Sequence, residues 1–278
     1  MSPPPSAPKS RRLLDIAIDR LATESSDPVR LRRLMANVII GQMLPPTLCV
    51  KGGSAIKLRY GDAATRFTRD LDLARATDLP SAVRAVEEAL RRGWCGFVAI
   101  LAPRRQAAPP GVPAPYLMAP FAAKLSYNGK PWLTVDLEIG HDELGDADAF
   151  DEAIPAALQD LFERLGFPRP RPIPVMGLLH QIAQKLHAVT EPGSRRAHDL
   201  LDLQLLLDRN PSDLSELKRL CRRLFAYRKR HSWPPDFHPS PDWPARYDAQ
   251  KADLPVLPSF EDASRWLQDL IRQIDSAP

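Results

Sequence analysis

Hydrophobic residues recur every three or four positions along several stretches of the chain, a spacing that places them on one face of a helix. Asp27 and Pro28 give a start signal for one of these helices, and Pro45 with Pro46 ends it. The predicted helices cover residues 11–22, 28–43, 81–92, 156–165, 177–189, 196–207, 215–230 and 259–274.

Shorter stretches are apolar throughout or alternate between polar and apolar residues, as β-strands do. Residues 128–130, Asn-Gly-Lys, are a good hairpin turn between two of them. The predicted strands are 48–50, 70–73, 96–101, 116–127 and 132–139. Because strands occur in the first half and helices dominate the second, we expect an α/β (α+β) fold with a small mixed sheet and a helical C-terminal lobe.

We expect three parts along the chain: a disordered tail at 1–9, a sheet lobe at 10–150 and a helical lobe at 151–278 that completes an active cleft. Prolines cluster at 3–8, 103–115, 168–174 and 234–258, and we interpret these segments as linkers or rigid loops. Residues 233–258 are expected to form a long ordered loop or a lid, with no role indicated.

Composition narrows the class of protein. The chain has 278 residues, 44% of them hydrophobic, enough for a core in one large or two small domains. No stretch approaches the ~18 apolar residues of a membrane helix, and the N-terminus lacks the apolar segment of a secretory signal. Three cysteines far apart argue against a disulfide framework. We therefore expect a cytoplasmic protein without membrane contact. The net charge of +4 is compatible with an RNA partner but not specific for one.

The segment 51–73 carries the most specific chemistry. Two glycines and a serine precede a predicted helix, so an anion can approach the backbone, and Gly53 and Ser54 can hold a triphosphate. Asp70 and Asp72 share one face of a strand, where Mg²⁺ or Mn²⁺ would remove their mutual repulsion. Singly, the first motif is usually a plain turn and the second a solvated edge strand. Their combination in this order favours a phosphoryl-transfer site.

Lys-Gly-Gly-Ser at 51–54 and Arg-Phe-Thr-Arg-Asp-Leu-Asp-Leu at 66–73 resemble the AbiEii/AbiGii-type (MenT-like) nucleotidyltransferase toxins of the DNA polymerase β-like superfamily. The resemblance covers roughly residues 30 to 210. It implies a nucleotidyltransferase lobe in which Asp70 and Asp72 hold metal. The nucleotide-binding residues that it implies are Lys51, Gly53, Ser54, Thr68 and Lys185. For Thr68 a regulatory phosphorylation site is the alternative.

The superfamily pattern also implies a third carboxylate, which helps to hold a second metal and can draw the proton from the attacking hydroxyl. Asp136 and Glu138 share one face of the predicted strand 132–139. Glu138 matches the Glu-Ile step that usually ends the family's strand, and Asp136 is the second choice. The alternative is the polar face of an edge strand.

A second block of the resemblance lies at 184–203. It implies that Lys185 meets the triphosphate and offsets charge on the leaving pyrophosphate, and that Asp199 orients Lys185 or the nucleotide. Asp202 follows Asp199 by three residues, shares its helix face and is a less certain metal ligand. His198 departs from the family's lysine at that position. The alternatives are a surface lysine and an aspartate favoured by the helix dipole.

The resemblance implies a Mg-dependent enzyme that moves an NMP from an NTP to an RNA acceptor, the 3′ end of a tRNA, releasing pyrophosphate and blocking translation. Its partners would be NTP, the RNA and a cognate antitoxin, and no DNA is expected. The alternatives are a transferase that modifies protein and an inactive nucleotide- or RNA-binding module. The basic stretch 215–230, with two aromatic residues among its cations, is either a solvated helix face or an RNA contact. The sequence does not indicate which NTP, which acceptor, which oligomeric state or which antitoxin mechanism applies.

Overall fold

The computed structural model describes residues 6–22, 27–62, 64–66, 68, 70–105, 118–145, 150–208, 213–251 and 253–278. The chain forms two compact units. We call them the sheet unit, Met1–Gly61 with Thr68–Met176, and the helical unit, Asp62–Phe67 with Gly177–Pro278.

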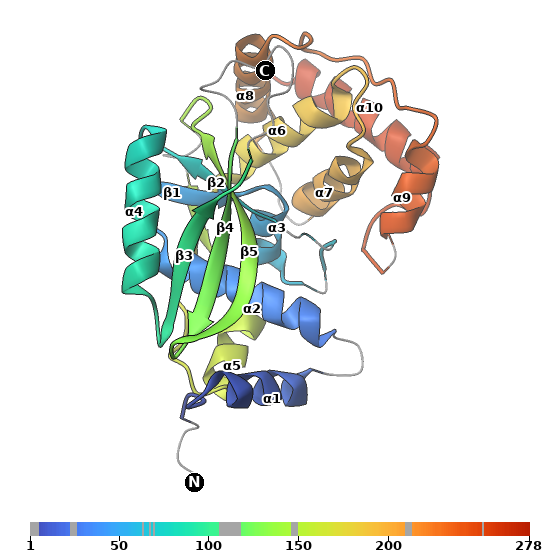
Figure 1. Cartoon of the computed structure of the whole chain (residues 1–278). Helices are drawn as coiled ribbons and strands as arrows, with labels where there is room; N and C mark the ends of the chain where they lie inside the picture. Colours follow the sequence, from blue (N-terminus) through green and yellow to red (C-terminus); the bar gives the residue numbers. More distant parts are fainter. Residues whose placement is uncertain are drawn as a thin grey trace. The chain divides into compact units, whose positions relative to one another are not determined.

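The sheet unit is built on a mixed sheet that has seven strands within the described residues, in the order β3-β4-β5-β2-β1-β7-β6 (Figure 1). In the middle, β2 and β5 run parallel, while β1 lies antiparallel to β2 and parallel to β7. The predicted α/β class with a mixed sheet is therefore confirmed. The strands are β1 (Leu48–Lys51), β2 (Asp70–Arg75), β3 (Phe97–Pro103), β4 (Ala119–Tyr127), β5 (Lys130–His141), β6 (Phe150–Ala153) and β7 (Ile173–Met176).

Helices α2, α3 and α4 of this unit pack against strands of the sheet, and α1 packs against α2. In Figure 1, α4 runs alongside β3, and α2 crosses the sheet and contacts β5 and β7. As predicted, Asp27 caps the start of α2, and its carboxylate accepts a hydrogen bond of 2.9 Å from the Val29 N–H. The helices are α1 (Arg11–Leu21), α2 (Pro28–Met43), α3 (Gly52–Tyr60), α4 (Leu79–Arg92) and α5 (Ala156–Arg164).

The helical unit contains α6 (Leu178–Thr190), α7 (Ala197–Asp208), α8 (Leu214–Arg228), α9 (Trp243–Lys251) and α10 (Phe260–Ser276). Helix α6 packs against α7 and α8, while α9 contacts α7 and α10. Helix α7 is buried almost all round, and its buried positions include both Asp199 and Asp202. A helix that is buried on every side must find partners for such charges within the protein.

Two expectations about the proline-rich segments are wrong. The cluster at 168–174 overlaps β7, which pairs with β1 and β6. Four residues with a proline among them are too short to show strand periodicity. The segment 233–258 contains α9, whose Pro244 lies in the first helical turn, where its missing N–H has no helical partner to lose. The predicted strand 116–127 begins at Ala119 in the structure, and its residues 116–117 lie outside the described residues.

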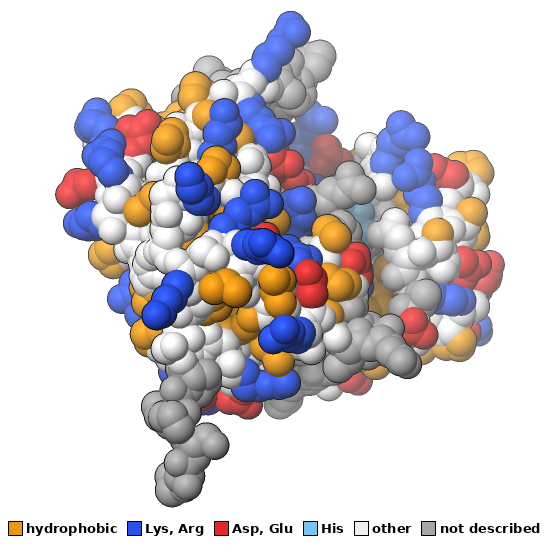
Figure 2. All heavy atoms as spheres, turned by 60° about the horizontal axis from the view of Figure 1, so that its bottom comes forward, with side chains coloured by type: hydrophobic (Ala, Val, Ile, Leu, Met, Phe, Trp, Pro, Cys, Tyr) orange, Lys and Arg blue, Asp and Glu red, His pale blue; other side chains and the backbone are white. Residues whose placement is uncertain are grey.

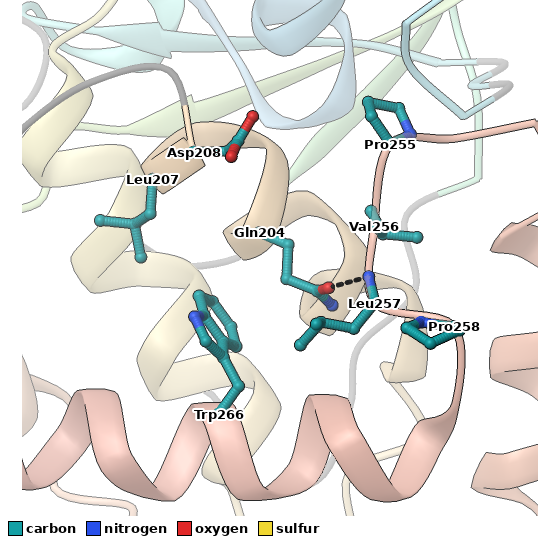
Figure 3. A pocket seen from close by; sticks show the side chains of 8 residues that line it. All are labelled: Gln204, Leu207, Asp208, Pro255, Val256, Leu257, Pro258 and Trp266. Carbon is teal, nitrogen blue, oxygen red and sulfur yellow. Dashed lines mark hydrogen bonds between the residues drawn. The ribbon is translucent and has the colours of Figure 1, made fainter.

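Of the tail 1–9, residues 1–5 lie outside the described residues, and residues 6–9 are described. The carbonyl of Pro8 accepts a hydrogen bond from the Tyr127 hydroxyl at the end of β4. On the face shown in Figure 2, lysine and arginine side chains are spread among hydrophobic and acidic ones. None of the described helices combines the length and the apolar character that crossing a membrane requires.

Candidate active site

Helix α3 begins directly after β1, at the double glycine. Gly52 has a φ of +66°, in the left-handed region that favours glycine. A Cβ at this position would lie 2.2 Å from Oδ2 of Asp72. The carboxylate of Asp72 therefore lies against the backbone at the start of α3, and a side chain at position 52 would displace it.

Ser54, in the first turn of α3, ties this helix to β2. Its side chain is buried, and its Oγ donates a hydrogen bond of 2.7 Å to the carbonyl oxygen of Asp70. Gly53 lies beside it and is half-buried. The N-cap residue Lys51 makes no side-chain cap bond, so the N–H groups of the first turn remain suited to an anion.

Acidic side chains gather on one face of the central strand pair. The parallel register places Asp70 opposite Asp136 and Asp72 opposite Glu138. The alternate residues of both strands are buried in the core, among them Leu71. Burial raises the pKa of the Glu138 carboxyl, and the charges of Asp72 and Asp70 raise it further. The alternation predicted that each pair of carboxylates shares a face of its strand, and the register brings the two pairs together on one face of the sheet.

Lys51 supplies a cation to this face. It lies opposite Asp72 in the β1–β2 register, and it partly offsets the raised pKa of Glu138. Its Nζ is 2.7 Å from the place that a Cβ on Gly140 would take, two residues after Glu138 on β5. The missing side chain at Gly140 leaves the room into which the Lys51 ammonium reaches.

Asp136 has a different partner from Glu138. Arg104, directly after β3, forms an ion pair with the carboxylate of Asp136. Because this cation pairs with Asp136, the carboxylate of Glu138 is less engaged by protein cations at this position, and the role of either residue as the third carboxylate stays a prediction.

The donor chemistry of this face suits a hard cation, because carboxylate oxygens are ligands that Mg²⁺ and Mn²⁺ prefer. Among the described residues, no three acidic, histidine or cysteine side chains converge closely enough to hold a metal ion by themselves. Mg²⁺ is usually bound by one or two carboxylates, with water and substrate phosphates completing its coordination. The face fits a cation on those terms.

In the helical unit, Lys185 of α6 lies between two carboxylates of α7. Its Nζ donates to Oδ1 of Asp199 at 2.7 Å and to Oδ2 of Asp202 at 2.6 Å. All three residues are buried, with exposed fractions of 5%, 0% and 1%. The spacing of three residues puts both carboxylates on the same side of α7, as predicted.

Two arginines complete this cluster. Arg66 binds both oxygens of Asp202 through Nε at 3.0 Å and Nη2 at 2.9 Å, and Arg196 donates from Nε to Oδ2 of Asp199 at 2.5 Å. Burial opposes ionisation of the two aspartates, but Lys185 and the arginines outweigh it and lower the pKa of both. The carboxylates are therefore ionised and fully engaged.

His198 lies close to Asp199 and to the cations of this cluster. Its Nε2 is 3.4 Å from Oδ1 of Asp199. Burial lowers the pKa of His198 to about 4, even though the charge of Asp199 raises it, so the imidazole is neutral at pH 7. His198 therefore adds no positive charge where the resembled family has a lysine.

A family model described as nucleotidyl transferase AbiEii toxin, type IV toxin–antitoxin system, matches residues 33–268. The chain belongs to this family. It is thus a member of a family of toxin nucleotidyltransferases, which implies an NTP substrate and an antitoxin partner.

The fold of this chain is similar to that of a solved nucleotidyltransferase toxin. MenT4, a nucleotidyltransferase toxin from Mycobacterium tuberculosis, is 17% identical, with a TM-score of 0.53 over 95% of this chain and 99% of that one. JHP933 from Helicobacter pylori is 18% identical, with a TM-score of 0.47 over 91% of this chain and 93% of that one. No curated protein sequence is significantly similar to this chain.

The arginines of the site were not predicted from the sequence. Arg66 begins the motif at 66–73 and Arg196 lies inside the block at 184–203, and two buried aspartates facing one lysine require a further cation. That requirement was the signal in the sequence that could have indicated a further cation at this site. Nothing in the sequence indicated Arg104. Thr68 is half-buried, and its role, like the roles of the other predicted site residues, stays a prediction.

Proposed function

We propose that this AbiEii-family protein transfers an NMP from an NTP to an RNA acceptor, the 3′ end of a tRNA, releases pyrophosphate and thereby blocks translation. The observation that carries the proposal is the β2–β5 register, in which Asp72 lies opposite Glu138, together with the contact of Asp72 against the glycine start of α3. An anion site and a cation site are then adjacent within one unit.

The phosphates of the donor would meet the start of α3. Backbone N–H groups in the first turn, at Gly53 and Ser54, could donate hydrogen bonds to an anion, and the helix dipole favours negative charge there. Lys51 is the cation nearest to this turn in the chain, and its side chain is half-buried. It would neutralise part of the triphosphate charge without a large loss of side-chain freedom.

Asp70 and Asp72 would hold Mg²⁺ or Mn²⁺, which when bound polarises the phosphoryl oxygens and lowers the cost of developing charge. Glu138 would take the proton of the attacking hydroxyl. A carboxylate with a raised pKa is a stronger base than a free one, which suits this role near neutral pH.

Lys185 would act on the leaving pyrophosphate. An ammonium group has three N–H donors, and the contacts with Asp199 and Asp202 use two of them. The third remains for an oxygen of the substrate. Asp199 would keep the ammonium in a fixed orientation, since it also binds Arg196.

An RNA acceptor is supported by the basic face of α8. Arg219, Arg222 and Arg223 are exposed on this helix, and its leucines are buried. Regularly spaced cations on a firmly packed helix can bind a phosphate backbone.

The proposal is tested by incubating the purified protein with each α-³²P-labelled NTP, Mg²⁺ and total tRNA. We expect label on tRNA with one or more NTPs, and none with the Asp70→Ala variant. Asp269→Ala on α10, which removes an exposed carboxylate from a surface ion pair, is the matched control and should label tRNA like the wild type.

Other outcomes contradict the proposal in distinct ways. Label on protein instead of tRNA would indicate a transferase that modifies side chains. Absence of transfer to any acceptor, with NTP binding intact, would indicate an inactive binding module. Full activity of Asp70→Ala would exclude the acidic face of β2 as the metal site.

A further inference from the structure

Asp202 forms ion pairs with two cations that come from distant parts of the sequence. Arg66 occupies both of its oxygens in a bidentate pair, and Lys185 adds a third hydrogen bond on Oδ2. Asp202 is 1% exposed, and a buried carboxylate that loses a partner is costly because no water replaces it. The three residues therefore behave as one unit rather than as separate contacts.

Arg66 belongs to a short segment that leaves one compact unit for the other. The segment Asp62–Phe67 is assigned to the helical unit, although the chain before and after it belongs to the sheet unit. Thr65 is 3% exposed, and its N–H donates to the carbonyl of Asp62 at 3.3 Å. Four residues after Arg66 the chain reaches Asp70, the first residue of β2. The Arg66–Asp202 pair thus anchors the segment that leads into the acidic strand.

The charge balance of the cluster explains why a cation is needed at position 66. Lys185, Arg66 and Arg196 bring three positive charges, and Asp199 and Asp202 bring two negative ones. Without Arg66, the cluster has no net positive charge, and Lys185 becomes the only cation on Asp202 among the described contacts. Its ammonium would then be drawn toward Asp202 and away from an anionic ligand.

We propose that Arg66 is a positioning residue for nucleotidyl transfer: through Asp202 it fixes Lys185 and anchors the segment that enters β2. Asp202 accordingly serves as the carboxylate that joins Arg66 to Lys185, and not as a metal ligand. This inference rests on the proposed function for its kinetic part and on the structure alone for the anchor.

The anchor is tested without any activity measurement. Hydrogen–deuterium exchange is followed in peptides that cover residues 62–68 in the wild type, Arg66→Ala, Arg66→Lys and Asp202→Asn. We expect at least a tenfold faster exchange in all three variants, because the fork of hydrogen bonds is lost in each. Arg265→Ala, which removes an exposed arginine paired with Asp262 on α10, is the control and should leave these peptides unchanged. Unchanged exchange in the Arg66 and Asp202 variants would overturn the anchor.

The positioning role is tested by steady-state kinetics with the NTP and RNA that the wild type uses. We expect Arg66→Ala to lower kcat by roughly 10- to 100-fold and to change KM for NTP by less than about threefold, since misplacement of a catalytic group affects the chemical step most. Arg66→Lys should recover part of kcat and carries the test if Arg66→Ala does not fold.

The double variant Arg66→Ala/Asp202→Asn decides how Arg66 acts. If Arg66 works through Asp202, the double variant loses no more activity than the worse single variant. If the activity losses of the two single variants multiply in the double variant, or if KM rises strongly while kcat is unchanged, Arg66 contacts the substrate directly. Either result would overturn the inference. An inactive wild type would contradict the proposed function, while the exchange experiment would still decide the anchor.

Discussion

At the scale of single residues, two glycines with the same backbone conformation have different surroundings. Gly52 and Gly129 have φ values of +66° and +75°. A Cβ on Gly129, in the hairpin between β4 and β5, would meet nothing within 4 Å, whereas one on Gly52 would collide with Asp72. Comparing alanine variants at the two positions therefore separates the energetic cost of the left-handed backbone, which both share, from the cost of the contact with Asp72, which only Gly52 has.

Alanine at these two positions should therefore have unequal effects. Gly129→Ala should destabilise the fold by about 1–2 kcal/mol, the cost of a left-handed conformation for a residue with a Cβ. Gly52→Ala should cost more and should also abolish transfer, because the Asp72 carboxylate must move. Denaturant unfolding and the tRNA-labelling reaction measure both. Equal losses of stability with activity kept would contradict the contact.

Glu138 carries the second prediction at this scale. A carboxyl whose pKa is raised on folding makes the folded state less stable as pH rises from its unfolded pKa through its folded pKa, so it costs stability at pH 7. Glu138→Gln should raise Tm at pH 7 in metal-free buffer and strongly reduce transfer. Glu88→Gln, at an exposed position of α4, is the control and should change neither. A lower Tm for Glu138→Gln would contradict the repulsion among these carboxylates.

At the scale of elements, helix α8 has one face with a clear structural role and one face whose role is a prediction. Its apolar residues are buried in the helical unit as their spacing predicted, and they include Leu217, Leu220, Leu224 and Phe225. Its cations are exposed, but some are already paired on the protein surface, such as Arg219 with Glu216. Arg222 and Arg223 are the exposed pair at the centre of the helix.

The variant Arg222→Ala/Arg223→Ala should weaken RNA binding while leaving the NTP site unaffected. We expect KM for tRNA to rise several-fold, KM for NTP to stay constant, and the dependence of log Kd on log salt to become shallower by about 1–2 units, about one per lost phosphate contact. Arg265→Ala/Arg272→Ala on α10 removes the same charge elsewhere and is the control. Equal effects of the two double variants would mean that only net charge matters.

At the scale of the whole molecule, buried titratable groups of the helical unit make its stability depend on pH. Burial lowers the pKa of His187 to about 3 and that of His198 to about 4, both below the usual value near 6.5. The unfolded chain therefore binds more protons than the folded one below pH 6.5, and stability falls as pH decreases. The lowered pKa values of Asp199 and Asp202 extend the same trend below pH 4.

The free energy of unfolding should accordingly decrease between pH 7 and pH 4, with each such histidine contributing a slope of up to about 1.4 kcal/mol per pH unit. His187→Phe, which keeps a ring against Phe225, should flatten the decrease between pH 6.5 and pH 4. His238→Asn, at an exposed site, should leave it unchanged. Denaturant titrations at a series of pH values measure the slopes. The same slope in His187→Phe and wild type would contradict this origin.

The sequence by itself determined much of the fold and the local chemistry of the site. Periodicity of 3.6 and of two residues is a local property, so it located most helices and the strands with Asp70 and Glu138. The Gly-Gly-Ser motif, which is also local, indicated the start of α3. The exceptions were β6, β7 and α9, where short length or proline hides the period.

What only the tertiary structure decided are the pairings between distant residues. The β2–β5 register puts Asp72 opposite Glu138, Arg104 occupies Asp136, and Arg66 closes the charge balance of Asp202. The side-chain pattern of each strand or helix indicates which residues share a face, but it does not indicate which neighbouring element that face contacts. That choice depends on the packing of the whole chain, where a buried charge is stable only beside the partner that folding brings to it.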